Sequence, residues 1–340
     1  MEPAPAFSML FVLQTSRGRS STVSLQIGCP ENSAVSRAVS VGLHFGSVRL
    51  CSGFSSLKGS GFGAAERLWP LGGARGFGMS DGTLEFFRSA GALTGKDACA
   101  VSWAHAVNSR RELARALTDH SHMLEADVIL RGRDPREPVM AHPPDTDSDI
   151  TLSEWLHGVR EHRKGIKLDF KSLEAVAPSL VLLEPVLSEK KFPVWINADI
   201  LTGPGGLATP LKAESFLSAT ADLPPHAVLS LGWTTGWTAG AENPGYSWDM
   251  VQEMEQICRD LPHAVTFPVR AALLAQSLPQ LCWLLQRSER FSLTVWTSTE
   301  DQFSLQDLRS YRSRLDVGKI YFDLPDSVRA ELRGTSAESE

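Results

Sequence analysis

Apolar segments of strand length alternate with helix-like segments eight times along most of this chain, and this alternation constrains the fold more than any other feature. Strands that are apolar on both faces belong to parallel sheets covered by helices on both sides. Eight such strand–helix units close naturally into a (β/α)₈ barrel, or TIM barrel, and the length of the chain suits one. The sequence therefore predicts an α/β barrel. Its expected strands are residues 101–107, 123–130, 165–171, 193–201, 227–233, 263–269, 292–298 and 319–324.

An open, doubly wound parallel sheet is the competing fold. That fold would require a glycine-rich phosphate-binding loop after the first strand, whereas this chain has AVNSRREL there. We therefore expect the TIM-barrel domain to span residues 97–330. A lead-in helix in 81–96 would precede it, and a disordered tail in 331–340 would follow it.

Residues 1–80 differ in character from the rest of the chain. They are rich in Ser, Gly and Arg and carry seven basic residues against three acidic ones. Glycine-rich stretches such as GSGFGAAE interrupt any regular period, so a disordered N-terminal extension is predicted. This acid-poor start also resembles an organelle transit peptide. Met79, just before the regular pattern begins, is a candidate start of a shorter product.

Net charge, cysteine spacing and the lengths of apolar runs argue against several classes of protein. A net charge of -6 argues against a general nucleic-acid binder, which would show a basic surplus. The five cysteines are scattered without zinc-site spacing, as in a reducing compartment. No apolar run approaches the ~18 residues of a membrane span, and FSMLFVL is too short for a convincing secretory signal. These features favour a cytoplasmic location and predict no transmembrane segment, while residues 1–80 leave the localisation open.

Two acidic residues, Glu125 and Asp127, lie inside the apolar run MLEADVIL. Residues i and i+2 of a strand point to the same side, so both carboxylates face one place. Two like charges in a buried strand do not both stay ionised without a neutralising cation. Oxygen ligands of this kind suit Mg²⁺ or Ca²⁺. Asp169 in KLDFK, on the next expected strand, is the third candidate ligand of this metal site.

Further polar residues fall where the expected strands end, which is where the active sites of TIM barrels lie. Each one alone has an ordinary interpretation as a salt bridge or a hydrogen-bonded structural residue. Their coincidence on otherwise apolar strands favours function, because buried polar groups need partners. The candidates beyond the acids are the two histidines His105 and His142, together with Lys167, Lys171, Asn197, Arg270 and Trp296, which could contact a bound substrate.

This set of motifs resembles the glycerophosphodiester phosphodiesterase and phospholipase-D-toxin superfamily, whose barrels are phospholipase-C-like. The shared features are a His at the end of the first strand, Glu-x-Asp on the second, a second His after it, and acid-x-Lys on the third. The resemblance implies that the three acids bind Mg²⁺ or Ca²⁺ and that the two histidines act as acid and base. It also implies that Lys171 contacts phosphate.

A narrower resemblance is to the Menorin family. The stretches VSWAHAVNS, LEADV, HPP, KLDFK, VWINADI, LSLGWTT and YFDLP are similar to that family throughout residues 97–325. This resemblance implies a role in neuronal maintenance. Two positions depart from the glycerophosphodiesterase pattern: Ala106 follows His105 where those enzymes have Arg, and Pro143 follows His142 where Asp is common.

The sequence thus favours a metal-dependent phosphodiesterase, a hydrolase or a cyclising lyase, acting on a phosphodiester small molecule or lipid. A catalytically inactive barrel that serves as a binding or adhesion partner of another protein is the main alternative. A carbon–carbon lyase with Lys167 or Lys171 as a Schiff-base nucleophile is the third hypothesis. The aromatic loop GWTTGWTAGAENPGYSW after the fifth strand would either line a substrate groove or pack on itself.

Overall fold

The computed structural model describes residues 22–23, 41–42 and 81–334, which belong to two units that divide between Gly72 and Gly73. In the first unit, β1 (Thr22–Val23) pairs antiparallel with β2 (Val41–Gly42). The predictions of a disordered extension, a transit peptide and an alternative start at Met79 concern residues that lie almost entirely outside the described ranges.

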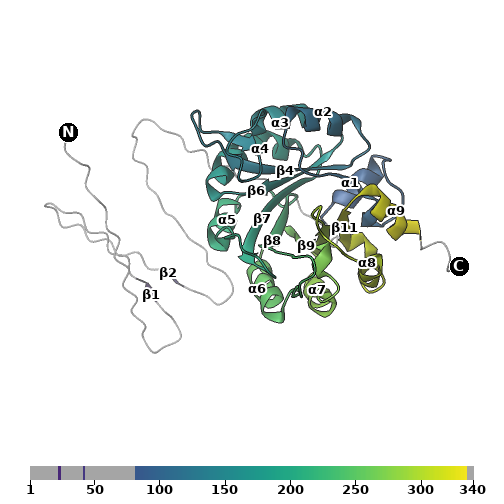
Figure 1. Ribbon diagram of the computed structural model, residues 1–340. Coiled ribbons are helices and arrows are strands. Elements are labelled where there is room, and N and C mark those ends of the chain that lie inside the picture. The colour runs from purple at the N-terminus through teal and green to yellow at the C-terminus, as the bar shows by residue number, and fades with distance from the viewer. Residues whose placement is uncertain (1–21, 24–40, 43–80, 335–340) are drawn as a thin grey trace, which may run out of the picture. The chain divides into compact units, whose positions relative to one another are not determined.

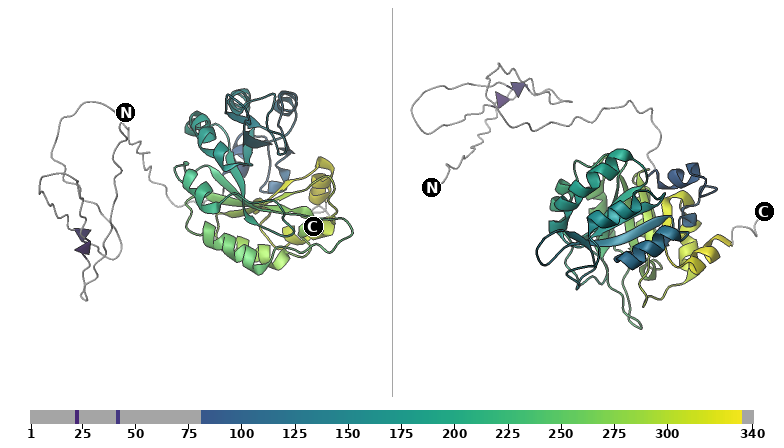
Figure 2. Two further views of the ribbon diagram at one scale, coloured as in Figure 1. Left: turned by 60° about the vertical axis from the view of Figure 1, so that its left-hand side comes forward. Right: turned by 90° about the horizontal axis from the view of Figure 1, so that it is seen from above.

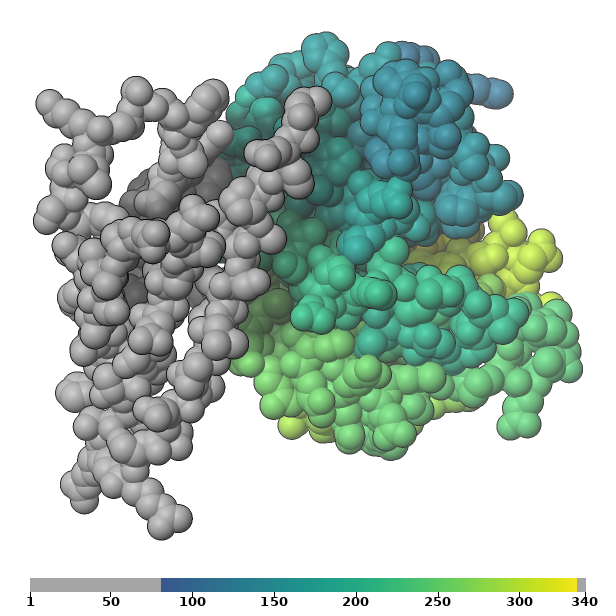
Figure 3. Space-filling model, turned by 90° about the vertical axis from the view of Figure 1, so that its left-hand side faces the viewer, coloured from purple at the N-terminus to yellow at the C-terminus, as the bar shows by residue number. Residues whose placement is uncertain are grey.

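Eight parallel strands form a nearly closed barrel in the second unit, which confirms the predicted fold (Figure 1). The coloured residues of this unit are closely packed in the space-filling view of Figure 3. In order around the barrel, the strands are β3 (Trp103–Ala104), β4 (Met123–Leu130), β6 (Gly165–Phe170), β7 (Val194–Thr202), β8 (Val228–Thr234), β9 (Ala264–Arg270), β10 (Phe291–Trp296) and β11 (Ile320–Asp323).

The first strand is shorter than the predicted 101–107. β3 pairs with Met123 and Leu124 of β4 and then ends, because the backbone turns at Ala106 into a left-handed conformation with φ of 54°. An unpredicted strand, β5 (Pro138–Met140), pairs antiparallel with the carboxyl-terminal part of β4. It occupies the edge that β3 leaves open.

Helices cover the outside of the sheet, as Figure 2 shows from two further directions. Local signals set several of their starts: Thr151 and Glu154 form a capping box at α3, and Pro279 lies in the first turn of α7. None of the described helices is both long and apolar enough to cross a membrane. The outer helices are α2 (Arg110–Thr118), α3 (Leu152–Val159), α4 (Leu173–Glu189), α5 (Ala213–Ala219), α6 (Trp248–Cys258), α7 (Leu278–Leu285), α8 (Leu305–Arg312) and α9 (Asp326–Gly334). The last of them continues past the predicted boundary at residue 330.

The lead-in helix α1 (Thr83–Ser89) packs against the amino-terminal end of the barrel interior. Phe87 joins the apolar cluster that includes Trp195 and Tyr321. Trp195 Nε1 donates to Thr83 Oγ1 at 2.8 Å, and the Tyr321 hydroxyl donates to Asp81 Oδ1 at 2.8 Å. This end of the barrel is therefore an apolar floor, and the inward-facing charged residues lie toward the carboxyl ends of the strands.

Side chains rather than a strand ladder close the barrel between its first and last strands. Within residues 81–334, no backbone pairing joins β3 to β11. The buried guanidinium of Arg329 on α9 instead donates to the carbonyl oxygens of Cys99, Val101 and Leu324 at 3.2–3.3 Å. We call this junction the seam; it brings the start of the barrel against its end.

Candidate metal and catalytic site

Three carboxylates meet at the carboxyl end of the barrel, as the sequence predicted. Glu125 and Asp127 point inward from β4, and the strand register places Asp169 of β6 directly beside Asp127. One oxygen of each lies within 4.8 Å of the others. The two β4 acids are only 2% and 5% exposed. An all-oxygen donor set of this spacing fits a hard divalent cation, so these residues could hold Mg²⁺ or Ca²⁺.

Hydrogen bonds from neighbouring loops and strands fix the orientation of the acids. Asn108 Nδ2 donates to Asp127 Oδ2 at 2.7 Å, and Asn108 Oδ1 accepts from the backbone N–H of Asp127 at 2.9 Å. The N–H of Ala106 donates to Glu125 Oε2 at 2.9 Å. The positive φ of Ala106, uncommon for a residue with a Cβ, aims that N–H at the carboxylate. The strained backbone at Ala106 thus serves to direct a hydrogen bond to Glu125 of the acidic cluster.

Asn197, which the sequence predicts to bind substrate, supports the third acid in this structure. Its Nδ2 donates to Asp169 Oδ1 at 2.6 Å, while Ser230 Oγ donates to Asn197 Oδ1 at 2.5 Å. The chain from Ser230 through Asn197 to Asp169 spans three neighbouring strands. It fixes the amide so that its N–H group faces the carboxylate.

Lys171 lies between two of the acids. Its Nζ is 2.6 Å from Asp169 Oδ2 and 3.1 Å from Asp127 Oδ1. Burial lowers the pKa of this ammonium, but attraction by Asp169 and Asp127 outweighs burial and raises the pKa above its usual value. A Schiff-base lysine needs the opposite shift, so the environment of Lys171 argues against this residue as the nucleophile of a lyase.

Burial and the neighbouring charges move the pKa values of Glu125 and Asp169 in opposite directions. Burial raises the pKa of Glu125. Burial also opposes ionisation of Asp169, but Lys171 and Lys167 outweigh it and lower the pKa of Asp169 to about 2. The buried Lys167 side chain is the register neighbour of Glu125. Both predicted lysines therefore lie within the acidic cluster.

His105 connects the acids to the seam. Its Nδ1 is 2.8 Å from Asp323 Oδ2 and 3.5 Å from Glu125 Oε2, and its side chain is 50% exposed. Attraction by Glu125, opposed by burial and assisted by Asp323, raises the pKa of His105 to about 10. Because the two acids face Nδ1, Nε2 is the ring nitrogen left for exchange with a substrate. Asp323 lies in the motif YFDLP, and its pairing with His105 was not predicted from the sequence.

The other predicted catalytic histidine lies on an exposed loop. His142 follows β5, and its Nδ1 donates to the carbonyl oxygen of Pro143 at 2.6 Å. Within the described residues, no hydrogen bond or ion pair joins it to the acidic cluster. Because Nδ1 makes this hydrogen bond, Nε2 is the ring nitrogen of His142 left to interact with a substrate.

Arg270, which is buried, and Trp296, which is half-buried, belong to a separate group. Arg270 makes a bidentate ion pair with the fully buried Asp301, with nitrogen–oxygen distances of 2.5–3.0 Å. Its guanidinium also stacks 5.3 Å from the ring centroid of Trp296. Its charge is thus already neutralised, and the structure gives it a role in fixing the loop after β10.

Asp199 is a further carboxyl group that the sequence did not single out for a role. It follows Asn197 by two residues on β7, a spacing that puts both side chains on the inner face. Its carboxylate lies so close to Gly232 that a Cβ there would be 2.4 Å from Asp199 Oδ1. Burial and the negative charge of Asp169 raise the pKa of Asp199 to about 7.

The aromatic loop after β8 is mostly self-packed. Trp233 and Tyr246 are buried and contact each other at 5.1 Å between ring centroids. Trp237 lines a rim hollow of about 750 Å³ together with Phe303. Self-packing therefore describes Trp233 and Tyr246, and a substrate groove beside Trp237 stays a prediction.

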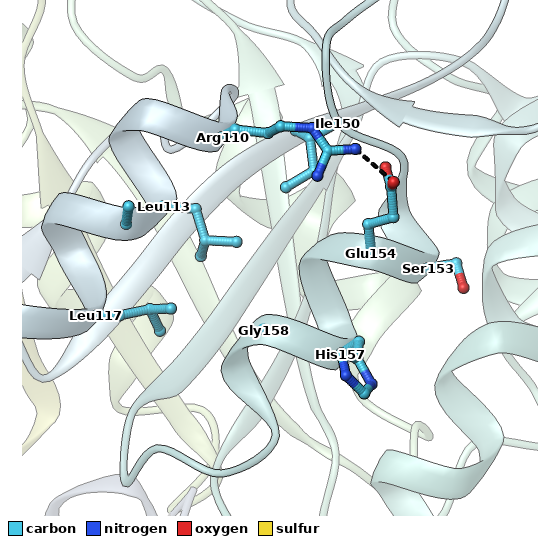
Figure 4. A pocket seen from close by; sticks show the side chains of 9 residues that line it. Arg110, Leu113, Leu117, Ile150, Ser153, Glu154, His157 and Gly158 are labelled. Carbon is cyan, nitrogen blue, oxygen red and sulfur yellow. Dashed lines mark hydrogen bonds and ion pairs between the residues drawn. The ribbon is translucent and has the colours of Figure 1, made fainter.

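Two other hollows differ in their relation to the acids. One of about 560 Å³ opens beside His105 and Asp323 at the seam, and we call it the seam pocket. The other, of about 530 Å³, lies between α2 and α3 and is bordered by the ion pair of Arg110 with Glu154 (Figure 4). The lining of this second hollow includes none of the predicted site residues.

Comparisons with known proteins agree with the sequence motifs. The model of the Menorin N-terminal domain family matches residues 97–329. Protein FAM151B from Homo sapiens is 47% identical over 256 residues, which are 75% of this chain and 93% of that protein.

Two solved structures show remote likeness to this chain. A GH18 chitinase from Pseudoalteromonas aurantia has 10% identity and a TM-score of 0.41, covering 68% of this chain and 98% of the chitinase. An L-ribulose 3-epimerase has 9% identity and a TM-score of 0.38, covering 70% of this chain and 86% of the epimerase. These values support no statement about substrate or mechanism.

Proposed function

The chain belongs to the Menorin family, and from this premise we propose that it is a metal-dependent phosphodiesterase. The observation that carries the proposal is the cluster of Glu125, Asp127 and Asp169 with His105 at its edge. Mg²⁺ or Ca²⁺ held by the three acids would polarise a phosphoryl oxygen and offset the negative charge that develops during cleavage.

The lysines make the site suitable for an anionic substrate. Three carboxylates bring three negative charges, and the ammonium groups of Lys167 and Lys171 compensate part of that charge beside them. A phosphodiester therefore meets less repulsion than the acids alone would cause. In this proposal Lys171 leaves its position between Asp127 and Asp169 and contacts the phosphate.

His105 acts in proton transfer. Asp323 holds Nδ1, which fixes the ring and leaves Nε2 to exchange a proton with an oxygen of the substrate. His142 is the second proton-transfer residue, with Nε2 as the accepting atom. Proton transfer by a positioned side chain typically contributes ~10²–10⁴ in rate. The nucleophile is water or a neighbouring substrate hydroxyl, and the latter would yield a cyclic phosphate.

Cleavage of bis(p-nitrophenyl) phosphate with and without Mg²⁺ or Ca²⁺ tests this function. We expect turnover that EDTA abolishes, and a loss of at least ~10²-fold in Asp127→Asn and in His105→Ala. Asp222→Asn and His157→Ala, which alter exposed residues outside the cluster, serve as matched controls and should retain turnover. Equal turnover in Asp127→Asn and Asp222→Asn would remove the assignment. The role in neuronal maintenance that the family resemblance implies stays a prediction.

A further inference from the structure

The seam pocket borders the candidate catalytic histidine directly. Its lining comes from the residues that follow β10 and β11 and from β3, so it opens at the same end of the barrel as the acids. His105 is common to both: its Nδ1 faces Glu125 and Asp323, while the ring contributes to the pocket wall. A group bound in the pocket is therefore next to the imidazole.

The charged groups that line the seam pocket already have partners. Asp301 is paired with Arg270, Asp323 with His105, and Asp326 with Arg329 and His120. Among the described lining residues there is no lysine or arginine. A second anionic group would find no free cation here, and a cationic group would have to compete with ion pairs already formed.

The remaining walls suit an apolar body with one polar end. Trp103, Phe303, Leu324 and Val328 supply apolar surface, and the segment Thr297–Thr299 supplies hydroxyl groups. The volume of about 560 Å³ falls within the usual range of small-molecule pockets, roughly 300–1,000 Å³.

We infer that the seam pocket binds the alcohol portion of the phosphodiester, and that this alcohol is uncharged and largely apolar. This inference rests on the proposed function for the identity of the reaction. The P–O bond to the alcohol breaks, and the alcohol oxygen receives the proton from Nε2 of His105. Water supplies the hydroxyl group that remains on phosphorus, and its other proton passes to His142. The acids and lysines hold the phosphate, and the seam pocket holds the departing group.

A series of glycerol phosphodiesters with methanol, butanol and octanol tests the pocket, with product release followed by ³¹P NMR. Each buried methylene contributes about 0.8 kcal/mol, so kcat/KM should rise roughly tenfold or more from the methyl to the octyl ester. Val328→Lys places a cation on the pocket wall and should abolish this chain-length preference. The matched control is Val181→Lys on the outer helix α4, where the native side chain is 70% exposed and lies outside the pocket.

Binding of 1-octanol alone, measured by calorimetry in EDTA, separates the pocket from the chemistry. Wild type and Val181→Lys should bind it, and Val328→Lys should bind at least tenfold more weakly. Octanol binding without turnover of any phosphodiester would overturn the proposed function and keep the pocket as an apolar alcohol site. Turnover that ignores chain length in wild type, or octanol binding unchanged by Val328→Lys, would overturn the inference and leave the phosphodiesterase standing.

Discussion

The ammonium of Lys171 occupies a position that a divalent cation would compete for. It lies 2.6 Å from Asp169 and 3.1 Å from Asp127. Coulomb's law with an effective dielectric constant of about 20 gives roughly 5–6 kcal/mol of gross attraction for each pair at such distances. Desolvation offsets much of this, and removing one partner of a buried pair typically costs ~3–5 kcal/mol. Lys171→Met, which keeps the apolar stem and removes the charge, should therefore destabilise the metal-free protein by about 3–5 kcal/mol.

Added Mg²⁺ or Ca²⁺ should reverse that loss. Without Lys171, the cation meets three carboxylates and no resident ammonium, so its dissociation constant should fall at least about tenfold, equivalent to ~1.4 kcal/mol. Urea unfolding in EDTA measures the first effect, and calorimetric titration with each cation measures the second. Lys164→Met is the matched control, because this buried lysine pairs with Asp119 and makes its hydrogen bonds outside the acidic cluster. It should lose stability with no change in cation affinity.

Two results would refute this reasoning. If Lys171→Met is as stable as wild type in EDTA, the ion pairs contribute no net stability. If the variant unfolds and no cation restores it, Lys171 is a permanent occupant of the site rather than a competitor. That second result would favour the alternative of a barrel that binds a partner without catalysis.

Three further predictions concern the supports of the site. Arg329→Met should lower the free energy of unfolding by about 3 kcal/mol or more, because it leaves buried carbonyl oxygens without hydrogen-bond donors. Arg329→Lys should be no more stable in urea unfolding, since lysine lacks the guanidinium fork. Asn108→Ala should lower the free energy of unfolding by ~1–3 kcal/mol and weaken the cation binding that calorimetry measures. An unchanged cation affinity would show that Asn108 does not orient Asp127 for the metal. In metal-free protein the pKa of His105 is raised to about 10, from an ordinary value of about 6.5. The protonated His105 therefore stabilises the folded state fully below about pH 6.5, and this stabilisation is lost as the pH rises through about 10. Melting temperatures of His105→Gln in EDTA should lack this alkaline decline, and an identical pH profile would contradict the His105 pairing.

The acidic cluster was predictable because it depends on rules that act within and between neighbouring strands. Glu125 and Asp127 share a face by the period of a strand, and parallel register brings Asp169 beside them. Carboxyl groups buried in apolar strands are also a strong compositional signal. The eight strands were foreseeable for the same reason, since their apolar runs are continuous.

The features that the sequence did not reveal depend on closure of the barrel or on loop geometry. His105 and Asp323 are separated by 218 positions and meet only because the first and last strands come together at the seam. The shortening of β3 follows from the backbone turn at Ala106. Alanine has no preference for the left-handed conformation, so the sequence does not indicate a turn there. The ion pair of Arg270 with Asp301 depends on the conformation of the loop after β10, which the sequence does not reveal.

Diffraction from crystals soaked in Ca²⁺, recorded at long wavelength to locate the ion by anomalous scattering, tests the central claim most directly. The account predicts a peak about 2.3–2.6 Å from carboxylate oxygens of Glu125, Asp127 and Asp169, with the Lys171 ammonium moved away from them. A map with no peak there, and with Lys171 still bridging Asp127 and Asp169 at saturating Ca²⁺, would contradict it.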